Sequence, residues 1–327
     1  MEKESNYLIG LEEVAPDAAA LVEIFRKNGA VSFQHLPVNE SRHSYLKSCE
    51  LNGLAKEDVK SVDTISCPVN GGHIGLRIYR GQEAPVGQHS PLVIFIHGGG
   101  WVLGNLDTHD PICRRIANQT ESTVISIDYR LAPEHKFPTQ IEDCYEAIKY
   151  IVDHEEDIRV DLTRVVIAGD SAGGSIATII ANHPNYWSDG MSIIGQVLLY
   201  PVTDLTAKSN SYGRITSGFP LTAESMLWFR EMYLPSQANL EDERISPLLA
   251  ASDKVQVPMF IVTVGLDPLA DEGIDYASAS AKAGTRVVHN HLPRHMHGIF
   301  TAAGKIGTGS RLLDEASLFI RSLFNGL

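Results

Sequence analysis

The segment GDSAG at residues 169–173 carries the strongest chemical signal in the sequence, because it fits the pattern G-x-S-x-G. An apolar run at 164–169 precedes it and a helix-compatible stretch follows it. In that context the serine lies on a tight strand-to-helix turn, and the flanking glycines leave room for the backbone. The helix N-terminus then offers N–H groups and positive potential to a developing oxyanion. The pattern predicts that Ser171 is a nucleophile, whereas a bare G-x-S-x-G can also be a structural turn.

A second signal is the segment HGGGW at residues 97–101, which follows an apolar run. Three consecutive glycines lose much conformational entropy on folding, so a purely structural loop rarely uses them. They let the backbone approach a ligand and direct several N–H groups at one point. We expect the N–H groups of Gly99, Gly100 and Ala172 to form an oxyanion hole. His97 precedes the nucleophile in the chain, so we interpret it as a structural residue that shapes the loop.

Four histidines between residues 289 and 300 raise the alternative of a metal site. His289 and His291 would share one face of a strand, and His295 or His297 could add a third ligand. A serine nucleophile with its own base and oxyanion donors has no use for a metal. We therefore expect no metal and no cofactor.

The composition is that of a globular chain of 327 residues with an acidic balance. Forty acidic residues against 27 basic ones give a formal net charge of −13. Such a field repels phosphate backbones and anionic surfaces, so we expect no nucleic-acid partner and no membrane partner. The start MEKESNYLIG shows no signal peptide, and the apolar runs are too short to span a bilayer. The cysteines are scattered without a CxxC pair, which favours a cytoplasmic protein: Cys49, Cys67, Cys113 and Cys144.

Short runs that are apolar on both faces recur in the second part of the chain, with segments of helical length between them. Such runs are typical of parallel strands covered by helices on both sides, so we expect a doubly wound α/β fold. The last strand is expected to end where Pro293 and Arg294 begin a loop. The predicted strands are 92–97, 123–129, 164–169, 196–202, 259–265 and 287–292.

Two elements precede this sheet. Residues 64–69 and 73–80 flank a pair of glycines and predict a β-hairpin. Residues 15–28 carry a helical stripe of apolar side chains, and Gly29 is placed to end that helix.

Taken together, these motifs resemble the hormone-sensitive lipase family of α/β-hydrolases, in particular its bacterial carboxylesterases. The resemblance extends from about residue 60 to the end of the chain. It implies an eight-stranded, mostly parallel sheet with a helical cap, and hydrolysis of carboxylic esters without a cofactor. The motifs that carry it are HGGGW (97–101), DYRLAPEHKFP (128–138), GDSAGG (169–174), GLDPLADEG (265–273) and HMHGIF (295–300).

The resemblance also implies the other two members of a catalytic triad. The family's acid is the aspartate of its DPL segment, which matches Asp267, although the acidic residues Asp271, Glu272 and Asp275 follow closely. The family's base precedes a glycine and matches His297. That base follows the acid by 30 residues (297 − 267), enough for a βαβ crossover between them.

The chain is expected to consist of a core and two cap segments. Residues 1–60 form an N-terminal cap segment, residues 61–204 and 248–327 the α/β-hydrolase core, and residues 205–247 a second cap segment inserted in the core. The inserted segment is rich in apolar side chains, and a peripheral helix packed on the core is the alternative to a lid. We expect the substrate to contact Trp101, Phe219, Trp228 and Ile299, the last of which stands where the family usually has phenylalanine.

The predicted function is a serine carboxylesterase that hydrolyses short-to-medium acyl esters through an acyl-enzyme intermediate. Amidase or lactonase activity could use the same groups. A ligand-binding receptor on the same scaffold is the alternative from another class, but the plant gibberellin receptors that resemble this family lack the catalytic histidine. The partner is then a small-molecule ester. The resemblance adds a homodimer through the sheet edge as one arrangement that the sequence leaves open.

Overall fold

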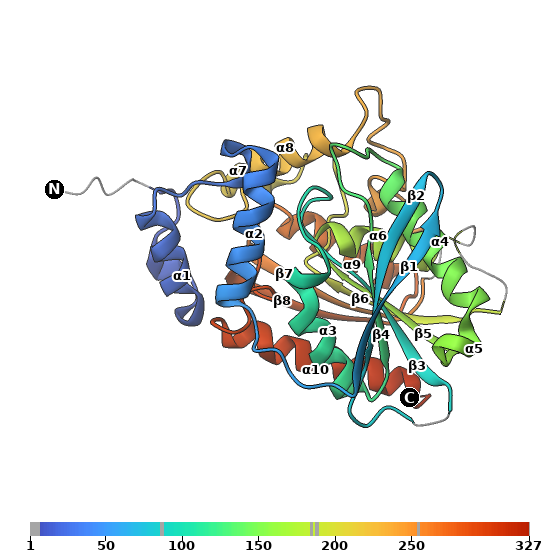
Figure 1. Ribbon diagram of the computed structural model, residues 1–327. Helices are drawn as coiled ribbons and strands as arrows, with labels where there is room; N and C mark the ends of the chain where they lie inside the picture. Colours follow the sequence, from blue (N-terminus) through green and yellow to red (C-terminus); the bar gives the residue numbers. More distant parts are fainter. Residues whose placement is uncertain (1–6, 86–87, 184–185, 187–189, 254–255, 327) are drawn as a thin grey trace.

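The computed structural model describes residues 7–85, 88–183, 186, 190–253 and 256–326. Its centre is an eight-stranded sheet with the order β1-β2-β4-β3-β5-β6-β7-β8 (Figure 1). The strands are β1 Ser61–Val69, β2 Gly72–Arg80, β3 Ser90–Ile96, β4 Thr123–Asp128, β5 Val160–Asp170, β6 Ile193–Leu199, β7 Met259–Leu266 and β8 Val287–Met296.

The sheet is parallel except at its N-terminal edge. β1 and β2 form the predicted antiparallel hairpin, with Val69 opposite Gly72, and β2 is antiparallel to β4. All other neighbouring strands run parallel. The predicted mostly parallel, eight-stranded sheet is therefore confirmed.

Helices cover both faces of the sheet, which explains why the central strands are apolar on both sides. Every residue of β3 is buried. Leu92, Ile94 and Ile96 pack in the core formed with α4, α6 and α9, while Val93 and Phe95 pack in the core formed with α3 and α10. These helices and the short α5 are α3 Leu106–Thr120, α4 Thr139–Asp153, α5 Glu155–Ile158, α6 Ala172–Asn182, α9 Ala270–Lys282 and α10 Gly307–Phe324.

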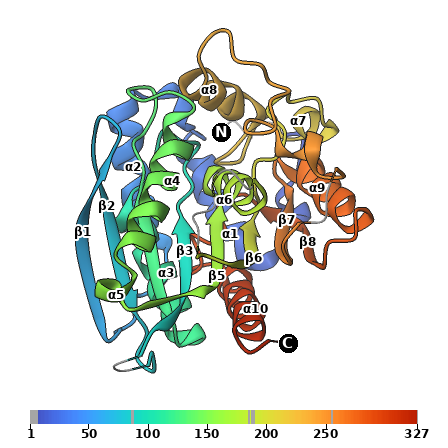
Figure 2. The ribbon, with the colours of Figure 1, turned by 90° about the vertical axis from the view of Figure 1, so that its right-hand side faces the viewer.

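The N-terminal segment and the insertion lie together near the carboxyl ends of the parallel strands. In Figure 2 the arrows of β5 and β6 point toward the side of the molecule where α8 lies. The two segments touch: the ring centroids of Phe33 and Phe229 lie 6.0 Å apart, and Arg26 Nε donates to the carbonyl oxygen of Gly218 at 3.0 Å. Their elements are η1 Leu11–Glu13, α1 Pro16–Lys27, η2 Phe33–His35 and α2 Val38–Asn52, followed later by α7 Asn210–Arg214, α8 Ala223–Tyr233 and η4 Pro247–Ala250.

Within the described residues, none of the helices combines the length and the apolar character that crossing a membrane requires. The four cysteines are all buried and free.

The prediction that Pro293 and Arg294 end the last strand is wrong. β8 continues through both residues to Met296. A proline is tolerated there because β8 is the edge of the sheet, and the pairing with β7 shifts its register between Val264 and Leu266. The strand therefore delivers the chain directly to His297.

The shifted register depends on Gly265, and we expect Gly265→Ala to destabilise this edge. A Cβ atom at this position would lie 2.3 Å from the carbonyl oxygen of Pro293. Relieving such an overlap costs about 1–3 kcal/mol, measured as a lower free energy of unfolding in urea. Gly307→Ala is the control, because nothing lies within 4 Å of a Cβ atom there. Equal stability of the two variants would contradict this account of the register.

Candidate active site

Ser171 lies on the expected tight turn between β5 and α6. Its φ of 54° and ψ of −121° are strained for a residue with a side chain. Two glycines make the turn sterically possible. A Cβ atom at Gly173 would lie 2.0 Å from the carbonyl oxygen of Ile96, and one at Gly169 would lie 2.5 Å from the backbone of Gly173. The local sequence thus presents the serine at the end of a central strand.

The structure brings the three predicted triad residues together. His297 Nε2 lies 3.0 Å from Ser171 Oγ, and His297 Nδ1 lies 2.6 Å from Asp267 Oδ2. Asp267 is fully buried, and its other oxygen accepts the N–H of Leu269 at 2.9 Å. The ring of Tyr200 packs on His297, with 4.1 Å between centroids. The arrangement can transfer a proton from the serine to a histidine whose orientation is fixed by a carboxyl group.

The acidic residues that follow Asp267 have other partners. Asp271 forms an ion pair with Arg214 at 2.9 Å. Glu272 is buried, and its Oε1 accepts the N–H groups of Thr203 at 2.8 Å and Asp204 at 3.1 Å. Burial raises the pKa of Glu272 well above its ordinary value, despite these two hydrogen bonds. Asp267 is the member of this acidic segment that contacts the histidine.

The glycine loop faces the same cavity as the serine. Gly99, Gly100 and Ser171 all line it, and the two glycines have φ of 119° and 61°. The described residues include no backbone acceptor for the N–H groups of Gly99, Gly100 or Ala172. Gly100 is also covered from the insertion, because a Cβ atom there would lie 2.3 Å from the ring of Phe229. The loop therefore offers free donors beside the serine oxygen.

A buried polar network under this loop holds it in place, and Asp170 is its centre. Asp170 Oδ1 accepts the N–H of Gly98 at 2.8 Å and lies 3.0 Å from His109 Nε2. Burial alone would raise the pKa of Asp170, but the attraction and hydrogen bond of His109, with the Gly98 N–H, lower it below its usual value. Asp170 thus connects the turn at Ser171 to the glycine loop.

His97 is a structural part of the same network. Its ring stacks on Tyr129 with 4.3 Å between centroids, and the Tyr129 hydroxyl donates to the His97 carbonyl oxygen at 2.7 Å. Burial and the neighbouring His109 lower the pKa of His97 to about 4, so its ring is neutral at pH 7. This environment suits a loop support rather than a general base.

The cavity above the serine has a volume of about 450 Å³ and mostly apolar walls. The N-terminal segment contributes side chains from α1, η2 and α2, and the insertion contributes part of the opposite wall. The apolar side chains lining it include Leu21, Ile24, Phe25, Phe33, Leu51, Leu103, Leu221 and Phe229. An acyl or alkyl group of modest size fits these dimensions.

None of the four residues predicted to contact the substrate lines this cavity. Trp101 is buried and stacks on Tyr233 with 4.2 Å between centroids. The glycines of the loop therefore face the cavity, whereas the indole of Trp101 packs in the core. Phe219 is buried beneath the guanidinium of Arg26.

The other two expected contacts also lie elsewhere. Ile299 is fully buried in the core, and Trp228 packs edge-on against Phe229. Phe229, one residue further along α8, faces the cavity instead. The composition of the insertion indicated an aromatic wall, but the rotation of the helix decides which ring faces the substrate.

The remaining histidines of the cluster have separate partners. His289 Nε2 and His291 Nδ1 both lie within hydrogen-bond distance of Thr263 Oγ1, at 2.8 and 2.9 Å. His295 Nε2 lies 3.0 Å from Asp17 Oδ1 of α1. In the part of the chain that the structure describes, no three His, Cys, Asp or Glu side chains are grouped to hold a metal ion.

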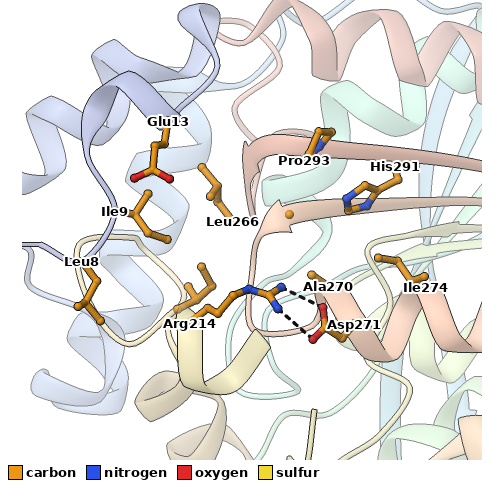
Figure 3. Close-up of a pocket in the computed structure, with 12 residues that line it drawn as sticks. Leu8, Ile9, Glu13, Arg214, Leu266, Ala270, Asp271, Ile274, His291 and Pro293 are labelled. Atoms are coloured by element: carbon orange, nitrogen blue, oxygen red, sulfur yellow. Dashed lines mark hydrogen bonds and ion pairs between the residues drawn. The ribbon is translucent and has the colours of Figure 1, made fainter. Parts of the chain in front are cut away.

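A second cavity of about 520 Å³ lies beside the edge of the sheet (Figure 3). The ion pair between Arg214 and Asp271 forms part of its wall, and Leu8, Ile9 and Glu13 of the N-terminal segment form another part. Ser171 and His297 are not among its lining residues. It is separate from the cavity above the serine.

Comparisons with known proteins agree with the fold and with the geometry of the site. Residues 93–301 match the family model of the alpha/beta hydrolase fold. The chain is 42% identical over 263 residues to the carboxylic ester hydrolase LipN of Mycobacterium tuberculosis, covering 78% of this chain and 69% of the relative. It is 34% identical over 287 residues to the ethyl acetate hydrolase of Pseudomonas putida, covering 86% and 90%. The solved ester hydrolase EH1AB1 from the metagenome of Lake Arreo, in complex with a bipyridine phosphonate derivative, has a TM-score of 0.87 at 34% identity, over 95% of this chain and 99% of that one.

The raised pKa of Glu272 predicts a pH-dependent stability that Glu272→Gln removes. The native state holds this proton more tightly than the unfolded state, so the contribution is complete below the unfolded pKa of about 4.3 and declines as the pH rises toward the native pKa. The free energy of unfolding of the wild type should therefore fall relative to that of the glutamine variant as the pH rises above about 4.5. Urea unfolding at several pH values measures this difference, with Glu83→Gln at an exposed position as the control. Parallel curves for the wild type and Glu272→Gln would refute the prediction.

Proposed function

Because this chain belongs to the α/β-hydrolase fold family and is a carboxylic ester hydrolase, we propose that it cleaves short-to-medium acyl esters with Ser171 as the nucleophile. The observation that carries the proposal is the hydrogen-bonded chain from Ser171 Oγ through His297 to Asp267, with distances of 3.0 and 2.6 Å.

The proposed reaction proceeds in two acyl-transfer steps. His297 Nε2 accepts the proton of Ser171 as the serine oxygen attacks the ester carbonyl carbon. Asp267 fixes the ring tautomer and stabilises the imidazolium that forms. His297 then donates this proton to the departing alkoxide, which leaves an acyl-serine ester. Water, deprotonated by His297, repeats the sequence and releases the carboxylic acid.

The proposed oxyanion hole consists of the N–H groups of Gly99, Gly100 and Ala172. The proposal is supported by the absence of a backbone acceptor for these N–H groups among the described residues and by the start of α6 directly after Ser171. Loss of one such donor typically costs roughly 3 kcal/mol of transition-state stabilisation. Phe229 packs against Gly100 and helps to exclude water from the donors.

The size of the cavity supports the proposed acyl range. A volume of about 450 Å³ with apolar walls accommodates a short chain and a small alcohol group. The relative from Pseudomonas putida is named for hydrolysis of ethyl acetate, a short ester. Ile24 and Leu51 line the cavity yet are 54% and 73% exposed, so its mouth opens between α1 and α2.

The division into a core and two cap segments agrees with this arrangement. We propose that residues 1–60 and 205–247 act as the cap, because both contribute walls to the cavity and contact each other. The remaining residues, 61–204 and 248–327, would form the catalytic core. A ligand-binding receptor would have no need of the Ser171–His297 hydrogen bond, whereas an amide or lactone could enter the same site.

We further propose that the protein acts in the cytoplasm. Four buried free thiols suit a reducing compartment. Burial raises the pKa of Cys49 to about 12 and that of Cys67 to about 11, so these side chains remain protonated and unreactive.

A series of p-nitrophenyl esters tests the proposed reaction and its acyl range together. The wild type should reach its highest kcat/KM with acyl chains of about two to six carbons, because longer chains outgrow the cavity. Ser171→Ala should lower kcat by roughly a millionfold, since the nucleophile is lost while the fold is kept. Wild-type rates in Ser171→Ala would exclude this serine, and a maximum at about twelve carbons or longer would exclude the acyl range.

The position of β8 at the end of the strand order supports a homodimer through the sheet edge. β8 pairs with β7 on one side, and Val288 on this strand is 39% exposed. Sedimentation velocity at micromolar concentration should give the mass of two chains. Val288→Lys should shift the equilibrium toward the monomer, because charges on an edge strand oppose pairing. A monomer in the wild type would exclude the homodimer.

A further inference from the structure

The strand that leads to the catalytic base also holds the N-terminal segment. His295 is buried two residues before His297, and its Nε2 lies 3.0 Å from Asp17 Oδ1 in the first turn of α1. The adjacent Arg294 contacts the backbone just before that helix. Its carbonyl oxygen accepts the N–H of Ala15 at 2.8 Å. Both residues of β8 therefore contact the start of α1.

The side chain of Arg294 strengthens this contact. Its Nε donates to the carbonyl oxygen of Glu13 at 3.1 Å, and Nη2 donates to that of Val14 at 3.0 Å and to that of Glu12. These carbonyl groups belong to or directly follow η1. A charged guanidinium that satisfies three backbone acceptors fixes the path of the chain into α1.

Asp17 joins a third element to the other two. Its Oδ2 accepts the N–H of Thr308 at 3.0 Å, in the first turn of α10. Burial tends to raise the pKa of Asp17, but the hydrogen bonds from Thr308 and His295 outweigh this effect and lower it. One carboxylate thus connects α1, β8 and α10.

Apolar packing holds α1 through Ala18 and Val22, but a cavity lies beside the residues that precede this helix. Figure 3 shows Leu8, Ile9 and Glu13 on one side of the second cavity, with His291 and Pro293 across it. This space of about 520 Å³ separates the segment from the edge of the sheet. The polar contacts of residues 12–17 add directional links between the two parts, beside the apolar packing of Val14 and Ala15 in the core.

The helix that these contacts hold forms a wall of the active-site cavity. Ala18 and Val22 on one face of α1 are buried in the core, while Leu21, Ile24 and Phe25 line the cavity above Ser171. A shift of the start of α1 therefore changes the distance between this wall and His297.

We propose that Asp17, Arg294 and His295 form a latch that positions α1 over the active site, and that the latch determines how tightly the apolar chain of an ester is held. Asp17 and His295 are positioning residues, because neither reaches the cavity that holds the substrate. The proposal rests on the proposed function, since it assigns the walls near Ser171 to substrate binding.

Asp17→Ala tests the latch through its effect on KM at two chain lengths. Each buried methylene is worth roughly fourfold in binding, so a displaced α1 should raise KM for p-nitrophenyl hexanoate by about four- to tenfold. KM for p-nitrophenyl acetate, whose chain barely reaches α1, should change less than about twofold, and kcat for both esters should stay within about threefold. Glu23→Gln is the matched control on the same helix, because it removes an exposed carboxylate that pairs with Lys27. It should leave both KM values unchanged.

A double-mutant cycle separates the latch from a general loss of stability. His295→Ala should raise KM for the hexanoate as Asp17→Ala does, and the double variant should show no more than the larger single effect. Asp17→Asn keeps an oxygen for Thr308 and should show a smaller increase. It also serves as the test if Asp17→Ala does not fold.

The outcomes are distinct from those that test the esterase proposal. An inactive wild type would refute the proposed function. A fully active wild type, combined with equal KM changes for both esters or with multiplicative effects in the double variant, would overturn the latch alone.

Discussion

The hydrogen bond between Asp267 and His297 joins the ends of two neighbouring strands, and most of the candidate active site is arranged around it. A buried carboxyl group needs partners for its oxygens, and the ring of His297 and the N–H of Leu269 provide them. Because β5, β7 and β8 run parallel, Ser171, Asp267 and His297 all lie at the carboxyl ends of the strands. The sheet topology thus brings together three residues that are far apart in the sequence, with His297 within hydrogen-bond distance of the other two.

A second aspartate–histidine pair supports the geometry of the candidate site. Asp170 and His109 are buried beneath the glycine loop, and Asp170 binds the backbone of Gly98. One pair orients the ring of His297 beside Ser171, and the other holds the glycine loop through the N–H of Gly98. The two pairs are chemically alike, but the serine oxygen contacts His297 of the pair with Asp267.

The fold and the tight turn at Ser171 could be predicted from local signals, whereas Asp267 and His297 follow from the resemblance to a family. Runs that are apolar on both faces indicate buried parallel strands, and the elbow and glycine loop follow from steric requirements within a few residues. Features that depend on long-range geometry were missed. The partner of His295 is Asp17, 278 positions away, and no local pattern specifies that pairing. Likewise, Phe229 lines the cavity where Trp228 was expected, because the rotation of α8 against the core determines which ring faces it.

The contact between Gly100 and Phe229 restricts how this chain can vary over evolutionary time. A side chain at position 100 would overlap the aromatic ring at 229, although 129 positions (229 − 100) separate them. A lineage that replaces the glycine must first accept a smaller residue on α8, and that residue would widen the cavity. Positions 100 and 229 should therefore change together among descendants of this protein, and the breadth of accepted substrates should change with them.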